Sequence, residues 1–355
     1  MNQKKNIIST ISTIGVFNDA LRVSLKKPSL SLFFLKTIIN QRRAHRRRLK
    51  WIEKGIQVPP VIIFSITNKC NLSCKGCYNK ALRMLSNNEL DTQKVIDILR
   101  QAEELGISFV VVAGGEPFVR KDFLTIIERF PKLIFLVFTN GLLIDDILLK
   151  EIKSRKNIVP LISIEGHLEQ TDFRRGDGVF KHLDSVMNNL NKESVFFGTS
   201  LTVTRKNFEL LTDDSFVTNL VKKGCKLFFY VEYTPITEET KDWVVTGEQR
   251  VKIPIIMDRY RRKFSALFAG LPAEEEMFGG CLSAGRGFIH INAEGDLEPC
   301  PFAPFSDVNL KEVTLKKALQ SKLLEEIRNN QFMLDESQGG CLLWANRKWV
   351  ESLLK

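Results

Sequence analysis

The sequence lacks the features that would place it in a membrane or outside the cell. No apolar run approaches the ~18 residues that a membrane-spanning helix needs, and the first residues have neither the apolar core nor the small-residue cleavage site of a secretory signal. Its seven cysteines also lack a pairing pattern, because six of them fall into two groups of three. Disulfides pair cysteines whereas metal sites group them, so this arrangement favours metal binding in a reducing compartment. We therefore expect a cytoplasmic protein.

The chain has 355 residues and an ordinary composition for a globular protein, with 44% apolar and 26% charged residues. This length allows one large domain or two modest ones. The net charge of +11 is placed unevenly. Residues 1–60 hold 7 Lys and 6 Arg against one Asp and one Glu, whereas residues 61–355 hold 39 basic and 39 acidic residues. The excess charge therefore belongs to an N-terminal arm, and the body is neutral.

The arm spans residues 1–58 and ends at Pro59-Pro60. Residues 30–39 are mostly apolar and predict a helix, and residues 41–51 (QRRAHRRRLKW) form a strongly basic stretch. This order suits an interfacial helix on an anionic membrane, which would make the protein peripheral. It also suits an acidic protein partner or nucleic acid, of which nucleic acid is the less favoured. The other alternative is a helix packed on the body with a solvated basic face.

The first cysteine group is Cys70, Cys74 and Cys77. It follows an apolar, β-branched run at 61–66, which predicts a buried strand with the cysteines on the loop that leaves it. Three thiolates on one short loop can converge on one metal centre. A tetrahedral zinc site or a fully protein-bound cluster takes four ligands, but the nearest histidines are His45 and His167. The group therefore predicts a metal site with one open position.

Strand-length apolar runs recur between residues 61 and 237, and helix-like segments separate them. The clearest of these helices covers residues 95–105, with Gly106 at its C-terminus. This alternation predicts parallel βαβ units and an α/β fold. Six units are short of the eight of a closed barrel, and a doubly wound open sheet is the competing topology. The runs lie at 61–66, 107–113, 133–138, 158–164, 195–203 and 226–233.

Small and polar residues follow the carboxyl ends of these runs. In parallel α/β folds the loops after these ends carry binding and catalytic groups. Each motif alone could be an ordinary turn or strand end, but their joint placement predicts one shared ligand pocket. The motifs are Gly114-Gly115-Glu116-Pro117, Thr139-Asn140-Gly141, Ser163-Ile164-Glu165, Thr199-Ser200 and Glu232-Tyr233.

The second cysteine group is Cys281, Cys300 and Cys341. A strand at 288–291 and a turn at 293–296 predict a hairpin that returns Cys300 to the side of Cys281. Cys341 follows a helix-like stretch near 315–330. The three cysteines could therefore form a second metal site. A small zinc site and buried free cysteines are the alternatives.

The remaining C-terminal segments predict structural roles. Residues 238–270 are expected to be helical, with a capping box at Thr246 and Gln249. Cys225 is expected to be a buried structural cysteine, and His290 a packing residue. The arginines at positions 259, 261 and 262 are expected to form a solvated face.

Cys-x3-Cys-x2-Cys-Tyr at 70–78 and Gly-Gly-Glu-Pro at 114–117 resemble the radical S-adenosylmethionine (SAM) superfamily over roughly residues 59–237. The resemblance implies a partial (β/α)6 TIM-like barrel with a [4Fe–4S] cluster at its open end. Cys70, Cys74 and Cys77 would bind three irons, and the fourth iron would bind SAM. It also implies three regions: a basic helical arm (1–58), the barrel (59–237), and linker helices with a small cluster-binding extension (238–355).

The resemblance also implies how SAM is held. Gly114, Gly115, Glu116 and Pro117 would hold its amino group, and the backbone near Tyr233 would border the adenine. One position departs from the family, which usually has an aromatic residue just before the third cysteine, where this chain has Gly76. The ribose and carboxylate region would be lined by Asn140, Ser163 and Ser200, with Arg175 as a carboxylate partner.

Cys281-x13-Gly295-x4-Cys300 resembles the SPASM extension, or its shortened form twitch, of many radical SAM enzymes. Only Cys341 remains of the later cysteines, so the resemblance implies one auxiliary iron–sulfur cluster with three thiolates. The implied reaction is reductive cleavage of SAM to a 5′-deoxyadenosyl radical that takes hydrogen from a substrate. An electron donor such as flavodoxin or ferredoxin would supply the electron. No catalytic acid or base is identified.

The substrate is left open by the sequence. SPASM and twitch members often modify peptides or proteins, which makes this class the leading hypothesis. A lipid or small metabolite at the membrane surface is the second. A non-catalytic metal-binding module is the third.

Overall fold

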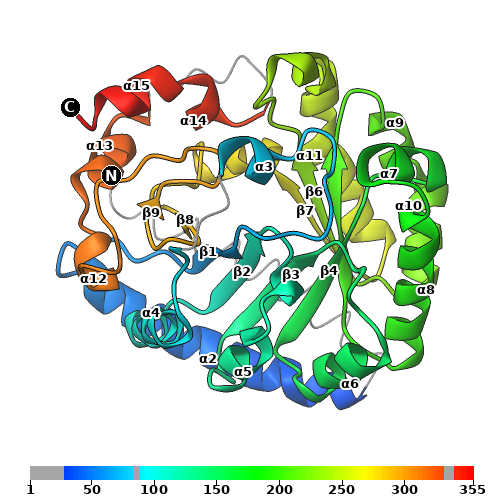
Figure 1. Cartoon of the computed structure of the whole chain (residues 1–355), viewed down its shortest axis with the longest axis horizontal. Helices are drawn as coiled ribbons and strands as arrows, with labels where there is room; N and C mark the ends of the chain where they lie inside the picture. Colours follow the sequence, from blue (N-terminus) through cyan, green and yellow to red (C-terminus); the bar gives the residue numbers. More distant parts are fainter. Residues whose placement is uncertain (1–27, 84–87, 332–339) are drawn as a thin grey trace.

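The computed structural model describes residues 28–83, 88–331 and 340–355, with side chains from residue 35 onward. Within these residues, nine strands form one sheet in the order β7-β6-β5-β4-β3-β2-β1-β8-β9 (Figure 1). Neighbouring strands are parallel except β8 and β9, which are antiparallel. The strands are β1 Val61–Thr67, β2 Phe109–Gly114, β3 Ile134–Thr139, β4 Ile158–Ile164, β5 Gly198–Val203, β6 Leu227–Glu232, β7 Leu267–Leu271, β8 Phe288–Ile291 and β9 Leu297–Glu298.

Helices follow the strands along the chain. The α-helices are α2 Pro28–Ile52, α3 Tyr78–Leu82, α4 Thr92–Leu105, α5 Phe123–Glu128, α6 Asp146–Ser154, α7 Leu168–Arg175, α8 Val179–Lys192, α9 Phe208–Leu211, α10 Asp214–Lys222, α11 Gly247–Lys263, α12 Leu315–Ala318, α13 Lys322–Asn329, α14 Leu342–Ala345 and α15 Arg347–Ser352. Short 3-10 helices are η1 Pro117–Val119, η2 Glu238–Trp243 and η3 Ala273–Phe278.

The predicted partial (β/α)6 barrel is confirmed. Strands β1 to β6 coincide with the six predicted apolar runs and lie side by side in chain order. Right-handed crossovers between strands in unbroken order place their helices on the same face of the sheet. A doubly wound sheet, in contrast, reverses its strand order at a switch point. The chain order therefore accounts for a barrel wall with helices outside it (Figure 1).

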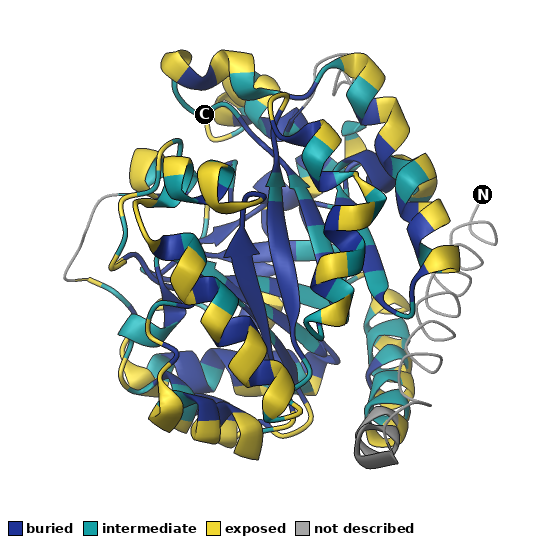
Figure 2. Cartoon of the chain, turned by 90° about the vertical axis from the view of Figure 1, so that its right-hand side faces the viewer, coloured by how far each residue is buried: buried dark blue, intermediate teal, exposed yellow. Residues whose placement is uncertain are grey.

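The outer and inner faces of this wall differ in exposure. On β1 and β2, Ile62 and Val110 are buried in the same cluster as Leu99 of α4. The alternate residues Ile63 and Val111 are only part-buried. A second, smaller cluster has its buried members on strands alone, at Ile134, Val159, Leu161 and Leu227. Figure 2 shows the buried strands beneath the helices, with intermediate positions among them. The inner face of the barrel therefore remains partly open to solvent.

Helix α4 confirms the helix predicted at 95–105 and shows why it ends where it does. Asp91 caps its N-terminus by accepting a hydrogen bond from the Lys94 amide at 2.7 Å. Gly106 ends it in the left-handed conformation, with a φ of +96°. A Cβ at this position would lie 2.5 Å from the Ala44 carbonyl oxygen of α2. Glycine is therefore needed both for the turn and for the close approach of the N-terminal helix.

Part of the basic arm has a structural role. Arg47 donates to the Glu103 carbonyl at 2.9 Å and Arg48 to the Gly106 carbonyl at 2.5 Å. These guanidiniums satisfy carbonyls at the C-terminus of α4, where the helix dipole is negative. Because Ser108, just before β2, also donates to Gln41 of α2, the arm lies at the amino ends of the strands. Residues 1–27 of the predicted arm lie outside the described residues.

The prediction that residues 238–270 are helical is wrong at its C-terminal end. The capping box at Thr246 and Gln249 is present and starts α11. Residues 267–271, however, form β7, which pairs with the otherwise unpaired edge of β6. Arg261, expected on a solvated face, donates to the Phe268 carbonyl at 2.8 Å and pairs with Glu274 at 2.6 Å. It therefore fastens β7 to the rest of the chain.

The predicted hairpin at 288–298 is confirmed. Strands β8 and β9 pair antiparallel with His290 opposite Glu298, and β8 also pairs parallel with β1. Residues after 238 thus continue the sheet at both edges. Within the described residues, no helix is long and apolar enough to cross a membrane.

Candidate active site at the carboxyl ends of the strands

The first cysteine group lies where predicted, on the loop that leaves the carboxyl end of β1. Cys70 is exposed, and Cys74 and Cys77 are half-buried. Burial raises the pKa of the Cys70 thiol, and the neighbouring Cys74 and Cys77 raise it further. The three thiols are therefore close enough to affect one another's charge. Positive charge nearby would help to hold them as thiolates.

The glycine pair after β2 shapes this loop. The Gly115 amide donates to the Thr67 carbonyl at 2.7 Å, and the Glu116 amide donates to the Lys69 carbonyl at 2.8 Å. A Cβ on Gly115 would overlap the Lys69 carbonyl oxygen. The backbone can therefore approach the cysteine loop only with glycine at this position.

Glu116 joins the ends of β2 and β3. Its buried carboxylate accepts hydrogen bonds from the Thr139 hydroxyl at 2.8 Å, the Asn140 amide at 2.7 Å and the Phe118 amide at 3.2 Å. Burial raises the pKa of Glu116, and these hydrogen bonds oppose the rise. Pro117 starts η1 directly after it. Glu116 therefore fixes the geometry of the strand ends.

Asn140 connects the end of β3 to the cysteine loop. Its side-chain amide donates to the Asn71 side-chain oxygen at 2.7 Å and lies 3.8 Å from the sulfur of Cys70. The structure thus brings this predicted residue to the first cysteine group. Ser163 and Ser200 are register partners on β4 and β5, and both are buried.

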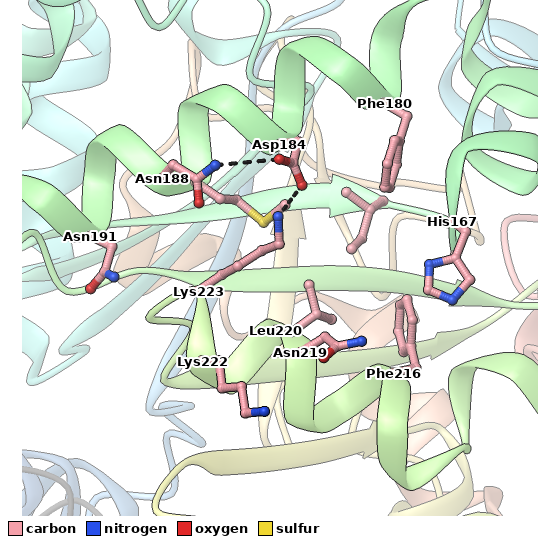
Figure 3. Close-up of a pocket in the computed structure, with 13 residues that line it drawn as sticks. His167, Phe180, Asp184, Asn188, Asn191, Phe216, Asn219, Leu220, Lys222 and Lys223 are labelled. Carbon is pink, nitrogen blue, oxygen red and sulfur yellow. Dashed lines mark hydrogen bonds and ion pairs between the residues drawn. The ribbon is translucent and has the colours of Figure 1, made fainter.

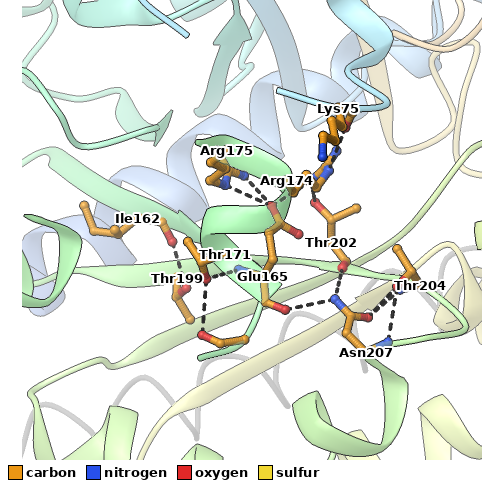
Figure 4. Close-up of polar contacts among 11 residues, drawn as sticks. Lys75, Ile162, Glu165, Thr171, Arg174, Arg175, Thr199, Thr202, Thr204 and Asn207 are labelled. Atoms are coloured by element: carbon orange, nitrogen blue, oxygen red, sulfur yellow. Dashed lines mark hydrogen bonds and ion pairs between the residues drawn. The ribbon is translucent and has the colours of Figure 1, made fainter. Parts of the chain in front are cut away.

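Glu165, at the end of β4, holds two arginines of α7 (Figure 4). One of its oxygens accepts from Arg174 at 2.6 Å and from Arg175 at 2.6 and 3.0 Å. Arg174 also donates to the Lys75 carbonyl at 3.2 Å, and the Lys75 amide donates to the Arg174 carbonyl at 2.8 Å. Burial raises the pKa of the Cys74 thiol, whereas Arg175 and Arg174 lower it. Two guanidiniums therefore sit beside the cysteine loop.

The sequence reasoning missed two residues of this arrangement. Arg174 is the clamp on the cysteine loop, although only its neighbour Arg175 was singled out. Asn207 donates to the carbonyls of Glu165 and Thr202, both at 3.0 Å, and so ties the ends of β4 and β5 together (Figure 4). The Arg-Arg pair downstream of a strand-end glutamate was a usable signal for the first. Asn207 is a single asparagine outside any motif, so the sequence contained no signal for its role.

Aromatic rings fill the place that Gly76 leaves. Gly76 has a φ of +64°, and a Cβ there would lie 2.5 Å from the Tyr233 hydroxyl and 3.1 Å from the Trp243 ring. The Tyr233 and Trp243 rings have centroids 5.2 Å apart. Both come from the segment after β6. The aromatic surface beside the third cysteine thus belongs to the barrel wall instead of the loop.

The structure also brings the second cysteine group together. Cys281, Cys300 and Cys341 lie in electrostatic contact with one another. Cys281 and Cys300 are buried. The Cys281 thiol donates to the Ser283 hydroxyl at 3.2 Å. Three thiols from separate segments therefore meet at one place, as the predicted hairpin required.

Two residues join this second group to the barrel. Glu232, at the end of β6, lies in electrostatic contact with the backbone amides of Gly340 and Ala273. Gly340 precedes Cys341, and Ala273 starts η3. Tyr78 lies in electrostatic contact with both Cys77 and Cys300. Its ring packs edge-on against Phe302 at a centroid distance of 4.8 Å. The two cysteine groups are therefore neighbours at one end of the barrel.

The donor sets fit iron–sulfur clusters. In a cluster, each thiolate binds a different iron, so the sulfurs lie farther apart than ligands of a single ion. Among the described residues, no three His, Cys, Asp or Glu side chains are arranged to hold one metal ion. The first group offers three thiols, two nearby guanidiniums and an exposed side, which suits a cluster that also binds a small polar ligand.

A separate pocket lies on the outside of the barrel, between α8 and α10 (Figure 3). Phe180, Asp184 and Lys223 are among its lining residues. Asp184 forms an ion pair with Lys223 and accepts from Asn188 at 3.3 Å. Ile164, from one of the predicted strand-end motifs, lines this pocket, but none of the predicted SAM-binding or cysteine residues does. The pocket is therefore distinct from the site described above.

Sequence comparison identifies a domain within the chain. The radical SAM superfamily profile matches residues 64–208. The mycofactocin maturase MftC of Mycolicibacterium smegmatis is 25% identical over 327 residues, which cover 83% of this chain and 81% of that protein. The AdoMet-dependent heme synthase of Oleidesulfovibrio alaskensis is 26% identical over 289 residues, which cover 74% of each chain.

Solved structures share the fold. SuiB of Streptococcus suis, bound to its precursor peptide SuiA, has a TM-score of 0.65 at 18% identity and covers 80% of this chain and 70% of that chain. The enzyme anSMEcpe with bound AdoMet has a TM-score of 0.60 at 17% identity and covers 82% and 95%. These findings do not support the alternative of a non-catalytic metal-binding module. The chain therefore contains a radical SAM domain at residues 64–208 and is an enzyme that uses a [4Fe–4S] cluster and SAM.

Proposed function

We propose that this enzyme modifies a peptide or protein. The observation that carries the proposal is the second cysteine group, which lies beside the first at the open end of the barrel. Similar proteins support it: one is a mycofactocin maturase, and the similar structures include SuiB with a precursor peptide and anSMEcpe with bound peptides. The partly open inner face of the barrel offers room for a substrate side chain.

In this proposal Cys70, Cys74 and Cys77 hold the [4Fe–4S] cluster. When bound, the cluster and SAM supply a 5′-deoxyadenosyl radical, which removes a hydrogen atom from a C–H bond of the substrate. A small reductant protein such as flavodoxin or ferredoxin delivers the electron. SAM is held by Gly114, Gly115, Glu116, Pro117, Asn140, Ser163, Arg175 and Ser200.

The residues around the loop orient these groups. Arg174 and Arg175 balance the negative charge of the thiolates, and Glu165 fixes both guanidiniums. Arg175 would also pair with the SAM carboxylate. The Tyr233–Trp243 ring pair provides the surface for the adenine, in place of the aromatic residue that the loop lacks at Gly76.

We also propose that Cys281, Cys300 and Cys341 hold one auxiliary iron–sulfur cluster, in an extension of the SPASM or twitch kind at residues 238–355. The arm (1–58) and the barrel (59–237) complete the proposed division of the chain. The contacts of Glu232 with the amides of Ala273 and Gly340 support a fixed placement of this extension on the barrel.

The test is anaerobic reconstitution with iron and sulfide, followed by SAM and a strong reductant. We expect 5′-deoxyadenosine, detected by liquid chromatography. Peptides encoded beside the gene are then added, and a mass change in one of them identifies the substrate. No 5′-deoxyadenosine from cluster-loaded protein would refute the radical chemistry. Turnover of a lipid or metabolite, with every peptide unchanged, would refute the peptide class.

A second candidate is the same chemistry on a lipid or small metabolite at a membrane surface. It is favoured by the exposed side of α2, where Leu35 and Ile39 are 54% and 41% exposed beside the exposed cations Arg42, Arg43 and Arg46. This surface lies at the amino ends of the strands, far from the cysteine loop, which is why the peptide proposal leads. Sedimentation with anionic liposomes tests it. Absence of binding by the wild-type protein would contradict it.

A further inference from the structure

A buried glutamate lies beside the second cysteine group. Glu275 is on η3, six residues before Cys281, and its residue surface is 6% exposed. Its carboxylate lies in electrostatic contact with the Leu282 amide and with the Cys281 thiol. It also lies in electrostatic contact with Cys341. One carboxylate therefore joins the place where three thiols meet.

The backbone around Glu275 is held firmly in this position. The Gly280 amide donates to the Glu275 carbonyl at 3.1 Å. Arg286 donates to the carbonyl of Cys281 at 2.6 Å and to that of Phe278 at 3.0 Å. The Ala273 amide, at the start of η3, lies in electrostatic contact with Glu232. These backbone hydrogen bonds hold the segment from η3 to Cys281, in which Glu275 lies in electrostatic contact with the thiols.

The neighbouring glutamates have other roles. Glu274 pairs with Arg261 at 2.6 Å and accepts from the Gly270 amide at 2.6 Å, so it fastens β7. The Glu276 side chain is 59% exposed. Of these three consecutive acids, Glu275 is therefore the one placed on the cysteines.

We propose that Glu275 is the fourth protein ligand of the auxiliary cluster held by Cys281, Cys300 and Cys341. This inference rests on the proposed auxiliary cluster. Three thiolates leave one iron without a protein ligand, and a carboxylate oxygen is a good ligand for iron. On cluster binding, each thiol would release one proton to bind iron as a thiolate, and Glu275 would bind the fourth iron through its carboxylate. Protein side chains would then bind all four irons, so this iron would not bind substrate.

The experiment isolates the auxiliary cluster in a protein with Cys70, Cys74 and Cys77 all changed to Ala. This background, its Glu275→Ala and Glu275→Cys variants and the matched control Glu276→Ala are reconstituted anaerobically. Iron per chain is measured, and the electron paramagnetic resonance spectrum of the reduced cluster is recorded with and without cyanide. Cyanide is the probe because it binds an iron that has an open position.

We expect roughly four irons per chain in the background, with a spectrum that cyanide does not change. Glu275→Ala should keep iron and gain a cyanide-dependent shift, or lose iron that Glu275→Cys retains. Glu275→Cys should resist cyanide, and Glu276→Ala should match the background. A Glu275→Ala protein that responds to cyanide as the background does would overturn the inference, and so would loss of iron in both variants.

The two levels of the proposal fail differently. A background protein that binds no iron, or that keeps all its iron after Cys281→Ala, would overturn the auxiliary cluster itself. A cluster that is present but insensitive to Glu275 would overturn only the ligand assignment.

Discussion

The two cysteine groups are built in opposite ways. Cys70, Cys74 and Cys77 lie within eight residues on one exposed loop, held from outside by Arg174 and Asn140. Cys281, Cys300 and Cys341 come from three distant segments and meet in a buried place beside a carboxylate. The first arrangement leaves a side open for a ligand, whereas the second surrounds its centre with protein. This difference suggests a division of work, with SAM chemistry at the first group and a closed centre at the second.

The largest expected effect comes from the first group. Cys74→Ala should abolish 5′-deoxyadenosine formation and remove about half of the bound iron, since two clusters of similar size are proposed. Iron assays and product chromatography measure both. Cys225→Ala is the matched control, because Cys225 is fully buried in the core and should leave both values unchanged. Product from the Cys74 variant at the wild-type rate would contradict the assignment.

The second group should give the complementary result. Cys281→Ala should also remove about half of the bound iron but leave SAM cleavage detectable, because the first cluster remains. The same two assays distinguish the variants. Unchanged iron content would refute the second cluster.

Removing the Glu165 carboxylate should destabilise the contacts that hold the Cys70–Cys77 loop. Glu165→Ala leaves the Arg174 and Arg175 guanidiniums, which are 13% and 10% exposed, without their buried counter-ion. We expect a loss of about 3 kcal/mol in unfolding free energy, measured by urea denaturation. Glu193→Ala, which removes the carboxylate of a surface pair with Lys153, should cause no measurable change. Equal stability of the two variants would show that the ion pairs of Glu165 with Arg174 and Arg175 do not stabilise the fold.

Gly76→Ala tests the aromatic surface beside the first group. The new methyl group would meet the Tyr233 hydroxyl, and we expect about tenfold weaker SAM binding by calorimetry, which corresponds to about 1.4 kcal/mol. Gly55→Ala is the control for backbone strain alone, since its φ is +78° and no atom lies within 4 Å of a Cβ there. It should lower stability by about 1 kcal/mol and leave SAM binding unchanged. Unchanged SAM binding in the Gly76→Ala variant would show that the Tyr233–Trp243 ring pair is not part of the SAM site.

The smallest expected effect concerns a hydrogen-bond network that links β1 of the barrel to the β8–β9 hairpin. His290 contacts Ser65 at 2.8 Å and Glu298 at 2.7 Å, and Glu298 also accepts from Arg83 at 2.6 Å. Burial lowers the pKa of His290. Burial opposes a lower pKa for Glu298, but the hydrogen bonds from His290 and Arg83 lower it overall. Both groups therefore bind fewer protons in the folded chain than in the unfolded chain.

Stability should consequently fall on acidification, first below the ordinary histidine pKa of 6.5 and then below the ordinary glutamate pKa of 4.5. Urea denaturation between pH 7.5 and pH 5 measures the slope. His290→Gln should flatten it above pH 5. A slope that is the same in both proteins would show that His290 does not contribute.

Local sequence signals account for the parts of the fold that could be predicted. The six strand runs and the helix ended by Gly106 depend on apolar patterns and one special backbone position. The first cysteine group needed only spacing along the chain. These features are set by neighbours in sequence, so they are visible without the fold.

The parts that were missed depend on contacts between distant segments. Residues 267–271 have no strong strand signal and become β7 because β6 offers an unpaired edge. The packing role expected of His290 omitted its hydrogen bonds to Ser65 and Glu298, which the sheet brings together. Glu275 lies within three consecutive glutamates, and only the folded chain distinguishes the buried one.

The linear strand order has a mechanical consequence. Its two ends, β7 and β9, are not hydrogen-bonded to each other in the described part of the chain. A fully closed barrel fixes its bore through strand number and stagger, because every strand is bonded on both sides. A wall with a seam can widen by uncurling, and no ladder hydrogen bond has to break. The width of the entrance is then set by the segments that span the seam, and their replacement is the simplest way to admit a bulkier substrate.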